Sequence, residues 1–157
     1  MTGLLAIDPG NEFTAWCLLD AQGMPTAWAK EANATVLNSD WGKEVPIYIE
    51  MIACYGMAVG KEVFDTCRFI GRLEQAAAER GAVTTLIYRA DVKMHLCHSM
   101  RADDSTIRAA LIDRFGPGKD KAIGRKATPG PLYGMAGDEW AALAVAVTAF
   151  DTRPSYE

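Results

Sequence analysis

The segment Leu4-Leu5-Ala6-Ile7-Asp8-Pro9-Gly10-Asn11 is a short apolar run that ends in an acidic residue and a turn signal. An apolar run bounded by Pro-Gly is typical of a strand buried within a sheet. Asp8 therefore stands at the end of a buried strand, directly against apolar residues. It is either a turn residue, since Asp is common at turns, or a functional carboxylate.

The segments that follow predict a sheet whose first strands form an antiparallel meander. Residues 13–19 and 26–31 are rich in strand-forming side chains. Residues 33–43 are polar and favour a loop or a short helix. A second buried strand, Val45–Ile49, is followed directly by Glu50.

The second half of the chain alternates between helical and strand patterns. Apolar residues recur at helical spacing over residues 60–80, and β-branched residues favour a strand over 83–88. The remaining expected elements are helices over 90–98, from about Ser105 to Phe115 and over 138–150, and a glycine- and proline-rich loop over 116–137. This order predicts a single α/β domain, residues 1–157, with a mixed sheet flanked by helices.

Composition limits the classes of protein that the chain can belong to. It has 157 residues, of which 50% are hydrophobic and 23% charged, and its formal net charge is −4. This composition is that of a globular domain, and no apolar run reaches the roughly 20 residues that span a bilayer. With no signal peptide at the N-terminus, we expect a cytoplasmic protein. The four cysteines, at 17, 54, 67 and 97, lack metal-site spacing and are expected to be buried or semi-buried thiols.

Three carboxylates stand out because each lies next to an apolar element. Asp8 and Glu50 end buried strands, and Asp138 begins the last apolar helix. Asp138 taken alone could be a helix N-cap. Glu50 ends a strand, where it has no role as a turn residue or a helix cap. If the strands are neighbours and the helix crosses them, the three acids converge and repel one another. Mg²⁺ or Mn²⁺, which prefer hard oxygen ligands, would hold such a cluster together.

The same residues carry a resemblance to a known family. Three segments resemble, in order, elements of the RuvC-type Holliday-junction resolvases: Leu4–Asn11, the strand Ile47-Tyr48-Ile49-Glu50, and the helix from Asp138 through Ala141–Thr148. The chain as a whole resembles bacteriophage members of that family. The resemblance implies an RNase H-like mixed five-stranded sheet, with an antiparallel meander followed by parallel strands. It also implies a metal-dependent endonuclease that resolves four-way or branched DNA as a homodimer, with Asp8, Glu50 and Asp138 binding two Mg²⁺ ions and Asp8 bridging them.

The sequence departs from this family at two positions. A second helix Asp is expected one turn after Asp138, and Ala141 stands there instead. Glu139 lies about 100° around the helix and is a poor substitute. A family lysine aligns with Asp104. Three alternatives follow: three acids suffice, Asp104 or Asp103 supplies a ligand from another direction, or catalysis is impaired.

The resemblance also suggests which residues contact DNA. Lys93 would neutralise a phosphate, although an ordinary surface lysine is equally expected, and Tyr55 would enter the junction. Further candidate contacts are basic: Arg101, Arg108, Lys119, Lys121, Arg125 and Lys126. His95 and His98 share a helix face but have no metal-site pattern. Phe64, Phe69 and Ile70 either pack in the core or form a dimer helix.

The distribution of charge qualifies the acidic total. Residues 89–128 contain nine Lys and Arg against five Asp and Glu, a net charge of +4, and the remainder of the chain has a net charge of −8. DNA binding is therefore expected to be local, salt-sensitive and strengthened by metal. Two other functions remain open: an RNase H-like nuclease acting on flaps, hybrids or other branched DNA, and a non-catalytic junction-binding protein.

Overall fold

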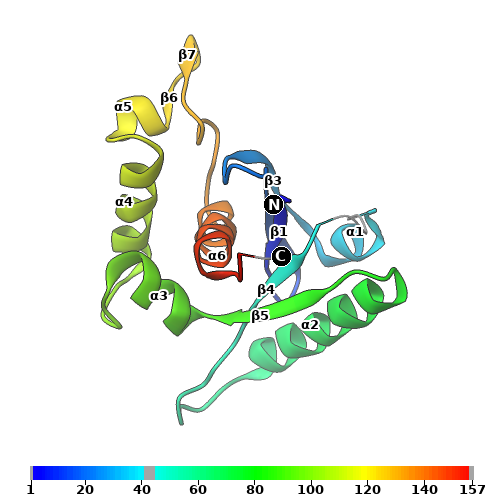
Figure 1. Ribbon diagram of the computed structural model, residues 1–157. Coiled ribbons are helices and arrows are strands. Elements are labelled where there is room, and N and C mark those ends of the chain that lie inside the picture. Colours follow the sequence, from blue (N-terminus) through cyan, green and yellow to red (C-terminus); the bar gives the residue numbers. More distant parts are fainter. Residues whose placement is uncertain (1, 41–44, 156–157) are drawn as a thin grey trace.

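The computed structural model describes residues 2–40 and 45–155, which fold around a five-stranded sheet (Figure 1). The sheet has the strand order β3-β2-β1-β4-β5, in which β1, β2 and β3 are antiparallel and β4 and β5 run parallel to β1. The strands are β1 Leu4–Asp8, β2 Phe13–Leu19, β3 Pro25–Ala32, β4 Ile47–Met51 and β5 Thr84–Tyr88. The predicted mixed sheet, a meander followed by parallel strands, is confirmed.

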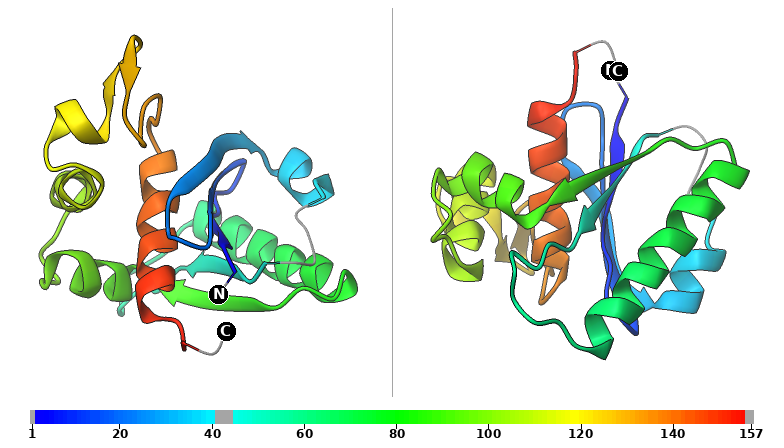
Figure 2. Two further views of the ribbon diagram at one scale, coloured as in Figure 1. Left: turned by 45° about the horizontal axis from the view of Figure 1, so that its top comes forward. Right: turned by 90° about the horizontal axis from the view of Figure 1, so that it is seen from below.

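Helices cover both faces of the sheet. Figure 2 shows α6 on one face and α2 on the other. The long helices are α2 Lys61–Glu79 and α6 Glu139–Thr152, and the shorter ones are α1 Asn33–Asn38, α3 Arg89–Cys97 and α4 Asp104–Phe115. Residues 33–43 were predicted to form a loop or a short helix, and residues 33–38 of this segment form α1. Residues 41–43 lie outside the described residues. Within the described part of the chain, no helix combines the length and apolarity needed to cross a membrane.

The alternation of side chains in the strands divides the core into two halves. Leu4 and Ala6 pack on the α6 side, whereas Leu5 and Ile7 pack on the α2 side. Since successive side chains of a strand point to opposite faces, Asp8 continues the set that faces α6. This parity places the acidic residue at the end of β1 on the same side as the last helix.

The two long helices differ because their sequences differ. In α2, buried Phe69, Ile70 and Leu73 recur on one face, while charged residues occupy the other. Phe69 and Ile70 are therefore core residues rather than a free face, whereas Phe64 is 59% exposed. The helix α6 is apolar almost all round and is buried from Ala142 to Ala149.

The segment 116–137 was predicted as a loop, and this prediction is wrong in part. It contains a short helix, α5 Lys119–Ala122, and a small hairpin of β6 Gly124–Arg125 and β7 Thr128–Pro129. Buried Ala122 and Leu132 attach the segment to the core on the α6 side. Gly124 has a φ of +69°, and a Cβ there would lie 2.3 Å from the carbonyl oxygen of Thr128, so this turn requires glycine.

The cysteines follow the prediction with one exception. All four are free thiols: Cys17 is buried, and Cys67 and Cys97 are partly buried. Cys54 is exposed, because it lies in the segment between β4 and α2 that projects away from both halves of the core. The expectation of burial is therefore wrong at that position.

Candidate functional site

Asp8 and Glu50 lie next to each other at one edge of the sheet. Ile7 of β1 pairs with Ile49 of β4 in parallel register, and the next residue of each strand is the acid. Tyr48, two residues before Glu50, packs on the α6 side, so Glu50 faces the same way as Asp8. Two sequence-distant carboxylates are thus brought together beneath the start of α6.

Burial and mutual repulsion change the protonation of this pair. Burial, followed by the charges of Glu50 and Asp138, raises the pKa of Asp8 to about 8. Burial also raises the pKa of Glu50. The charge of Arg89 lowers this pKa, and the charge of Asp104 raises it further. A carboxylate whose ionised form is disfavoured gains most from an added positive charge. The pair is therefore suited to a cation.

Glu50 has an oxygen without a partner. Its Oε2 is buried and accepts no hydrogen bond among the described residues. Buried polar atoms are normally paired, and an unpaired one suggests a ligand that completes its contacts. Carboxylate oxygens are the donors that Mg²⁺ and Mn²⁺ prefer. The residues at this edge therefore fit the divalent ion that the sequence predicts.

Asp138 occupies the N-cap position of α6, but its side chain makes no capping hydrogen bond. It forms instead an ion pair of 2.7 Å with Lys30 of β3. Lys30 lies opposite Ala15 of β2, and Ala15 lies opposite Asp8, so this ion pair brings Asp138 toward the end of β1, where its charge raises the pKa of Asp8. The simple N-cap interpretation of Asp138 therefore does not hold, and the three predicted acids do gather at one edge of the sheet.

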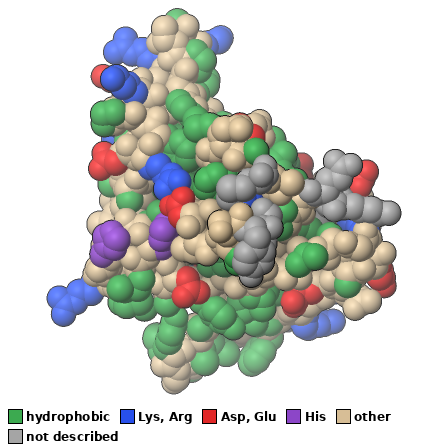
Figure 3. Space-filling model, in the orientation of Figure 1, with side chains coloured by type: hydrophobic (Ala, Val, Ile, Leu, Met, Phe, Trp, Pro, Cys, Tyr) green, Lys and Arg blue, Asp and Glu red, His purple; other side chains and the backbone are tan. Residues whose placement is uncertain are grey.

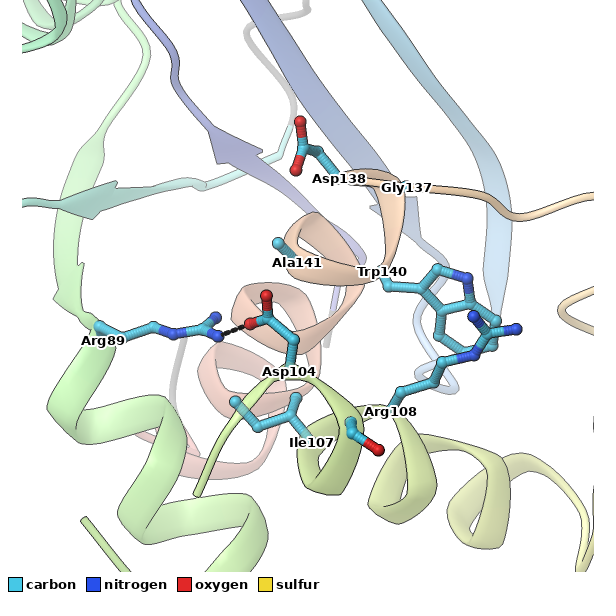
Figure 4. Close-up of a pocket in the computed structure, with 9 residues that line it drawn as sticks. Arg89, Asp104, Ile107, Arg108, Gly137, Asp138, Trp140 and Ala141 are labelled. Carbon is cyan, nitrogen blue, oxygen red and sulfur yellow. Dashed lines mark hydrogen bonds and ion pairs between the residues drawn. The ribbon is translucent and has the colours of Figure 1, made fainter. Parts of the chain in front are cut away.

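A cleft of about 320 Å³ opens beside Asp138, between the start of α6 and the start of α4 (Figure 4). Arg89, the first residue of α3, forms an ion pair with Asp104 across it. Ala141 faces the same cleft, between Asp138 and Asp104 in the view of Figure 4. The cleft thus brings a fourth acid and a basic residue to the site.

Two neighbouring acids are committed to other contacts. Asp103 is the N-cap of α4, and its Oδ1 accepts a hydrogen bond of 2.9 Å from the backbone N–H of Thr106. That bond and the Thr106 hydroxyl lower the pKa of Asp103. Glu139 accepts a hydrogen bond of 2.8 Å from the backbone N–H of Ala136. Asp104, rather than Asp103 or Glu139, is therefore the acid available to the cleft.

The described side chains do not form a ready-made metal site. In residues 2–40 and 45–155, no three Asp, Glu, His or Cys side chains are close enough to share one ion. Asp138 and Asp104, the two outer acids, are each held by a basic side chain. Each ion pair engages one oxygen of its carboxylate, Oδ2 of Asp138 and Oδ1 of Asp104, so a cation would compete with Lys30 and Arg89 for these acids.

The other predicted residues are spread over the molecule. Lys93 lies on α3, one turn after Arg89, and no described contact joins it to the acids. Tyr55 is 67% exposed and has a φ of +49° in the segment after β4. Arg108 lines the cleft, and its guanidinium lies 4.4 Å from the ring centre of Trp140. Arg101 is exposed in the turn between α3 and α4.

Four basic candidates share one projecting part of the chain. Lys119 and Lys121 belong to α5, and Arg125 and Lys126 belong to β6 and the turn that follows it. All four are exposed, and Figure 3 shows Lys and Arg side chains over this end of the molecule. They lie apart from the acids, so any contact they make with DNA is outside the acidic edge.

Sequence reasoning missed two residues of the site, Lys30 and Arg89. Lys30 is exposed between two partly buried residues of β3, and a lysine in a strand is usually an ordinary solvated side chain. Arg89 immediately follows the strand beside β4, and that position was the available signal, because parallel strands end at one edge. His95 and His98 do not belong to this acidic site. His95 contacts Asp151 in the last turn of α6, and His98 ends α3 with a φ of +55°.

No protein-family model and no curated protein matches the sequence. The structure, however, is similar to that of RuvC from Thermus thermophilus. A structure of that protein in complex with a Holliday junction substrate has a TM-score of 0.68 at 16% identity and covers 98% of this chain and 96% of its own. Another RuvC structure has a TM-score of 0.68 at 17% identity, covering 97% and 96%. With this order of strands and helices over nearly the whole chain, the molecule has the RNase H-like fold of RuvC.

Proposed function

We propose that this chain is a metal-dependent endonuclease that hydrolyses phosphodiesters in branched DNA, with four-way (Holliday) junctions as the preferred substrate. The observation that carries the proposal is the pair of neighbouring acids Asp8 and Glu50, one with a pKa raised to about 8 and the other with an unpartnered buried oxygen. Such a pair has no structural use, and an acid pair on this fold supports phosphoryl chemistry. The similarity to a structure of RuvC with a Holliday junction substrate supports the choice of substrate.

Asp8, Glu50 and Asp138 would hold Mg²⁺ or Mn²⁺, two ions in the full site. Bound ions of this kind generate a nucleophilic hydroxide and stabilise the leaving oxygen of a phosphodiester. The chain itself supplies the partial burial of Asp8 and the strand register that orients the pair. Lys30 and Arg89 are basic residues at this edge that can contact phosphate oxygens, and Lys93, one turn after Arg89 on α3, is a further candidate.

DNA would extend from the acidic edge across the cleft toward the exposed basic residues. Arg108 is held by Trp140 beside the cleft, and the basic residues of α5 and β6 lie farther along. Tyr55 is exposed in the segment between β4 and α2, where an aromatic ring can stack on an unpaired base. We propose that two copies act together, since symmetric cuts need two sites, and that residues 1–157 form one nuclease domain acting in the cytoplasm, of the host if the protein is phage-encoded.

A substrate panel tests this function. Labelled four-way junctions, flaps, RNA–DNA hybrids and linear duplexes are incubated with the protein and Mg²⁺, and products are mapped to the nucleotide. The proposal requires junction selectivity with paired symmetric nicks. Cleavage of flaps or hybrids in preference would support an RNase H-like nuclease with another substrate.

Asp8→Asn is the matched control for contaminating nucleases, because it keeps the size of the side chain and removes its charge. Metal-dependent cleavage must disappear in this variant. If the wild-type protein binds junctions but shows no cleavage that this change abolishes, the chain is a junction-binding protein and the enzymatic proposal is wrong. This outcome is worth testing because Ala141 stands at the cleft where the family resemblance implies a second helix acid.

A further inference from the structure

The residues of the site divide into two groups of the same composition. The first group contains the strand acid Asp8, the exposed helix-start acid Asp138 and the basic residue Lys30, which is paired with Asp138 at 2.7 Å. The second group contains the strand acid Glu50, the exposed helix-start acid Asp104 and the basic residue Arg89, which is paired with Asp104. Each group thus has one buried acid, one exposed acid and one cation.

Each exposed acid lies close to the strand acid of its own group. The strand register explains the first pairing: Asp8 lies opposite Ala15 of β2, and Ala15 lies opposite Lys30 of β3, the partner of Asp138. The register also explains the second pairing. Glu50 is paired with Ile87 in β5, and Arg89 follows two residues later at the same edge of the sheet. Arg89 then reaches Asp104 across the cleft.

Asp104 is free to change partners. Arg89 contacts only its Oδ1, and the side chain is 93% exposed. Its neighbour Asp103 performs the capping of α4, so the helix does not depend on Asp104. On the facing wall, Ala141 contributes only a methyl group. The cleft therefore has space beside Asp104, next to Arg89, which lies two residues after the strand partner of Glu50.

We propose that Asp104 is a metal ligand, which together with Glu50 holds a second divalent ion while Asp8 and Asp138 hold the first. This inference rests on the proposed function and adds to it a fourth carboxylate, supplied from α4 rather than from α6. Bound ions would compete with Lys30 and Arg89 for these two carboxylates, and the two basic side chains would then be available to a phosphate.

The formal charge of the site favours two bound divalent ions rather than one. Four carboxylates and two basic residues give the site a formal charge of −2. One divalent ion makes the site neutral, and a second makes it positive, which is what an incoming phosphodiester anion requires. Asp104 allows the second ion to bind without an acid at position 141.

The experiment counts bound ions without using activity. Metal-free protein is titrated with Mn²⁺, and free Mn²⁺ is followed by its electron paramagnetic resonance signal. Wild-type protein is expected to bind two ions. In Asp104→Asn one ion is retained, and the dissociation constant of the other rises on the order of 10-fold or more, as loss of supporting contacts alone costs 10- to 100-fold. Asp113→Asn, an exposed acid on the same helix, is the matched control and leaves both ions unchanged.

A relocation variant separates a ligand from a merely electrostatic neighbour. In Asp104→Asn/Ala141→Asp the carboxylate returns to the facing wall of the cleft, and the second ion is expected to bind again. Circular dichroism checks that each variant is folded. The proposal is overturned if Asp104→Asn binds both ions as the wild type does, if the wild type binds one ion, or if relocation restores nothing. A wild type that binds no Mn²⁺ overturns the metal dependence of the proposed function as well, whereas an unaffected Asp104→Asn overturns this inference alone.

Discussion

The two ends of α6 carry acids in opposite states. At its start, Asp138, Asp8 and Glu50 gather, and the pKa of Asp8 is raised to about 8. In its last turn, Asp151 receives two hydrogen bonds of 2.6 Å from Arg114 and one contact of 2.7 Å with His95. Partial burial raises the pKa of Asp151, but these partners outweigh it and the pKa is lowered.

This difference separates a part of the molecule built for stability from one built for a ligand. At the end of α6, the carboxylate of Asp151 joins α3, α4 and α6 through its contacts with His95 and Arg114. At the start, the two strand acids face each other and their compensating cations are held by the outer acids. The same helix therefore stabilises the fold at one end and stores repulsion at the other.

The largest expected effect comes from Asp8→Asn. Cleavage of a four-way junction in Mg²⁺ should fall by roughly 100-fold or more, the size of effect seen when one charge-stabilising group is removed from an active site. The metal-free variant should melt at a higher temperature than the wild type at pH 8, because a buried repelling charge is gone. Cleavage assays and thermal melts on the same preparation measure both. A variant that loses activity and stability together would contradict the stored repulsion.

The dependence of stability on pH should distinguish the two ends. The folded-state pKa of Asp8 is raised from its ordinary 3.8 to about 8, so its favourable contribution is present below pH 3.8 and is lost as pH rises toward 8. The loss is on the order of a few kcal/mol, since one pKa unit corresponds to about 1.4 kcal/mol.

Asp151 acts in the opposite direction. Its lowered pKa contributes stability above the ordinary value near 3.8, and this contribution is lost as pH falls through the folded-state value. Urea unfolding at pH 3, 5, 7 and 9 with a chelator measures both effects. Asp8→Asn should reduce the decline between pH 5 and 9, with the remainder due to Glu50, whose pKa is also raised, and should leave the acid limb unchanged.

Adding Mg²⁺ should stabilise the wild-type protein through the start of α6 alone. Linkage predicts about 2.7 kcal/mol at a free Mg²⁺ concentration 100 times the dissociation constant. Thermal melts with Mg²⁺ and with a chelator measure the shift at pH 8. The same shift in Asp8→Asn would mean that the ion binds elsewhere.

The smallest effect is expected from Asp151→Ala. The substitution leaves Arg114 and His95 without their acceptor, and we expect a loss of about 1–2 kcal/mol, since these side chains are partly exposed. Asp113→Ala, an exposed acid on α4, is the control and should change the free energy of unfolding by less than about 0.5 kcal/mol. Junction cleavage should be unaffected. Loss of cleavage in folded Asp151→Ala would show that the two ends are coupled.

The sheet and its acids were predictable because both follow from local patterns. Apolar runs of strand length and the carboxylates that end them predict the edge where Asp8 and Glu50 meet. The hairpin of residues 124–129 was not predictable, because two-residue strands leave no periodic pattern. Nor was the pairing of Arg89 with Asp104, since a contact between residues in different elements depends on how α3 and α4 pack.

The alternation of side chains in β1 and β4 limits which insertions and deletions this protein can accept. A deletion of one residue within Leu4–Ile7 would turn Asp8 toward Phe69 and Leu73 on the α2 side of the sheet. A deletion of two would keep its direction and only shorten the strand. Length variants of odd and even size in these two strands should therefore differ sharply in viability. In a library of such variants, those that survive are expected to preserve the parity of positions 8 and 50.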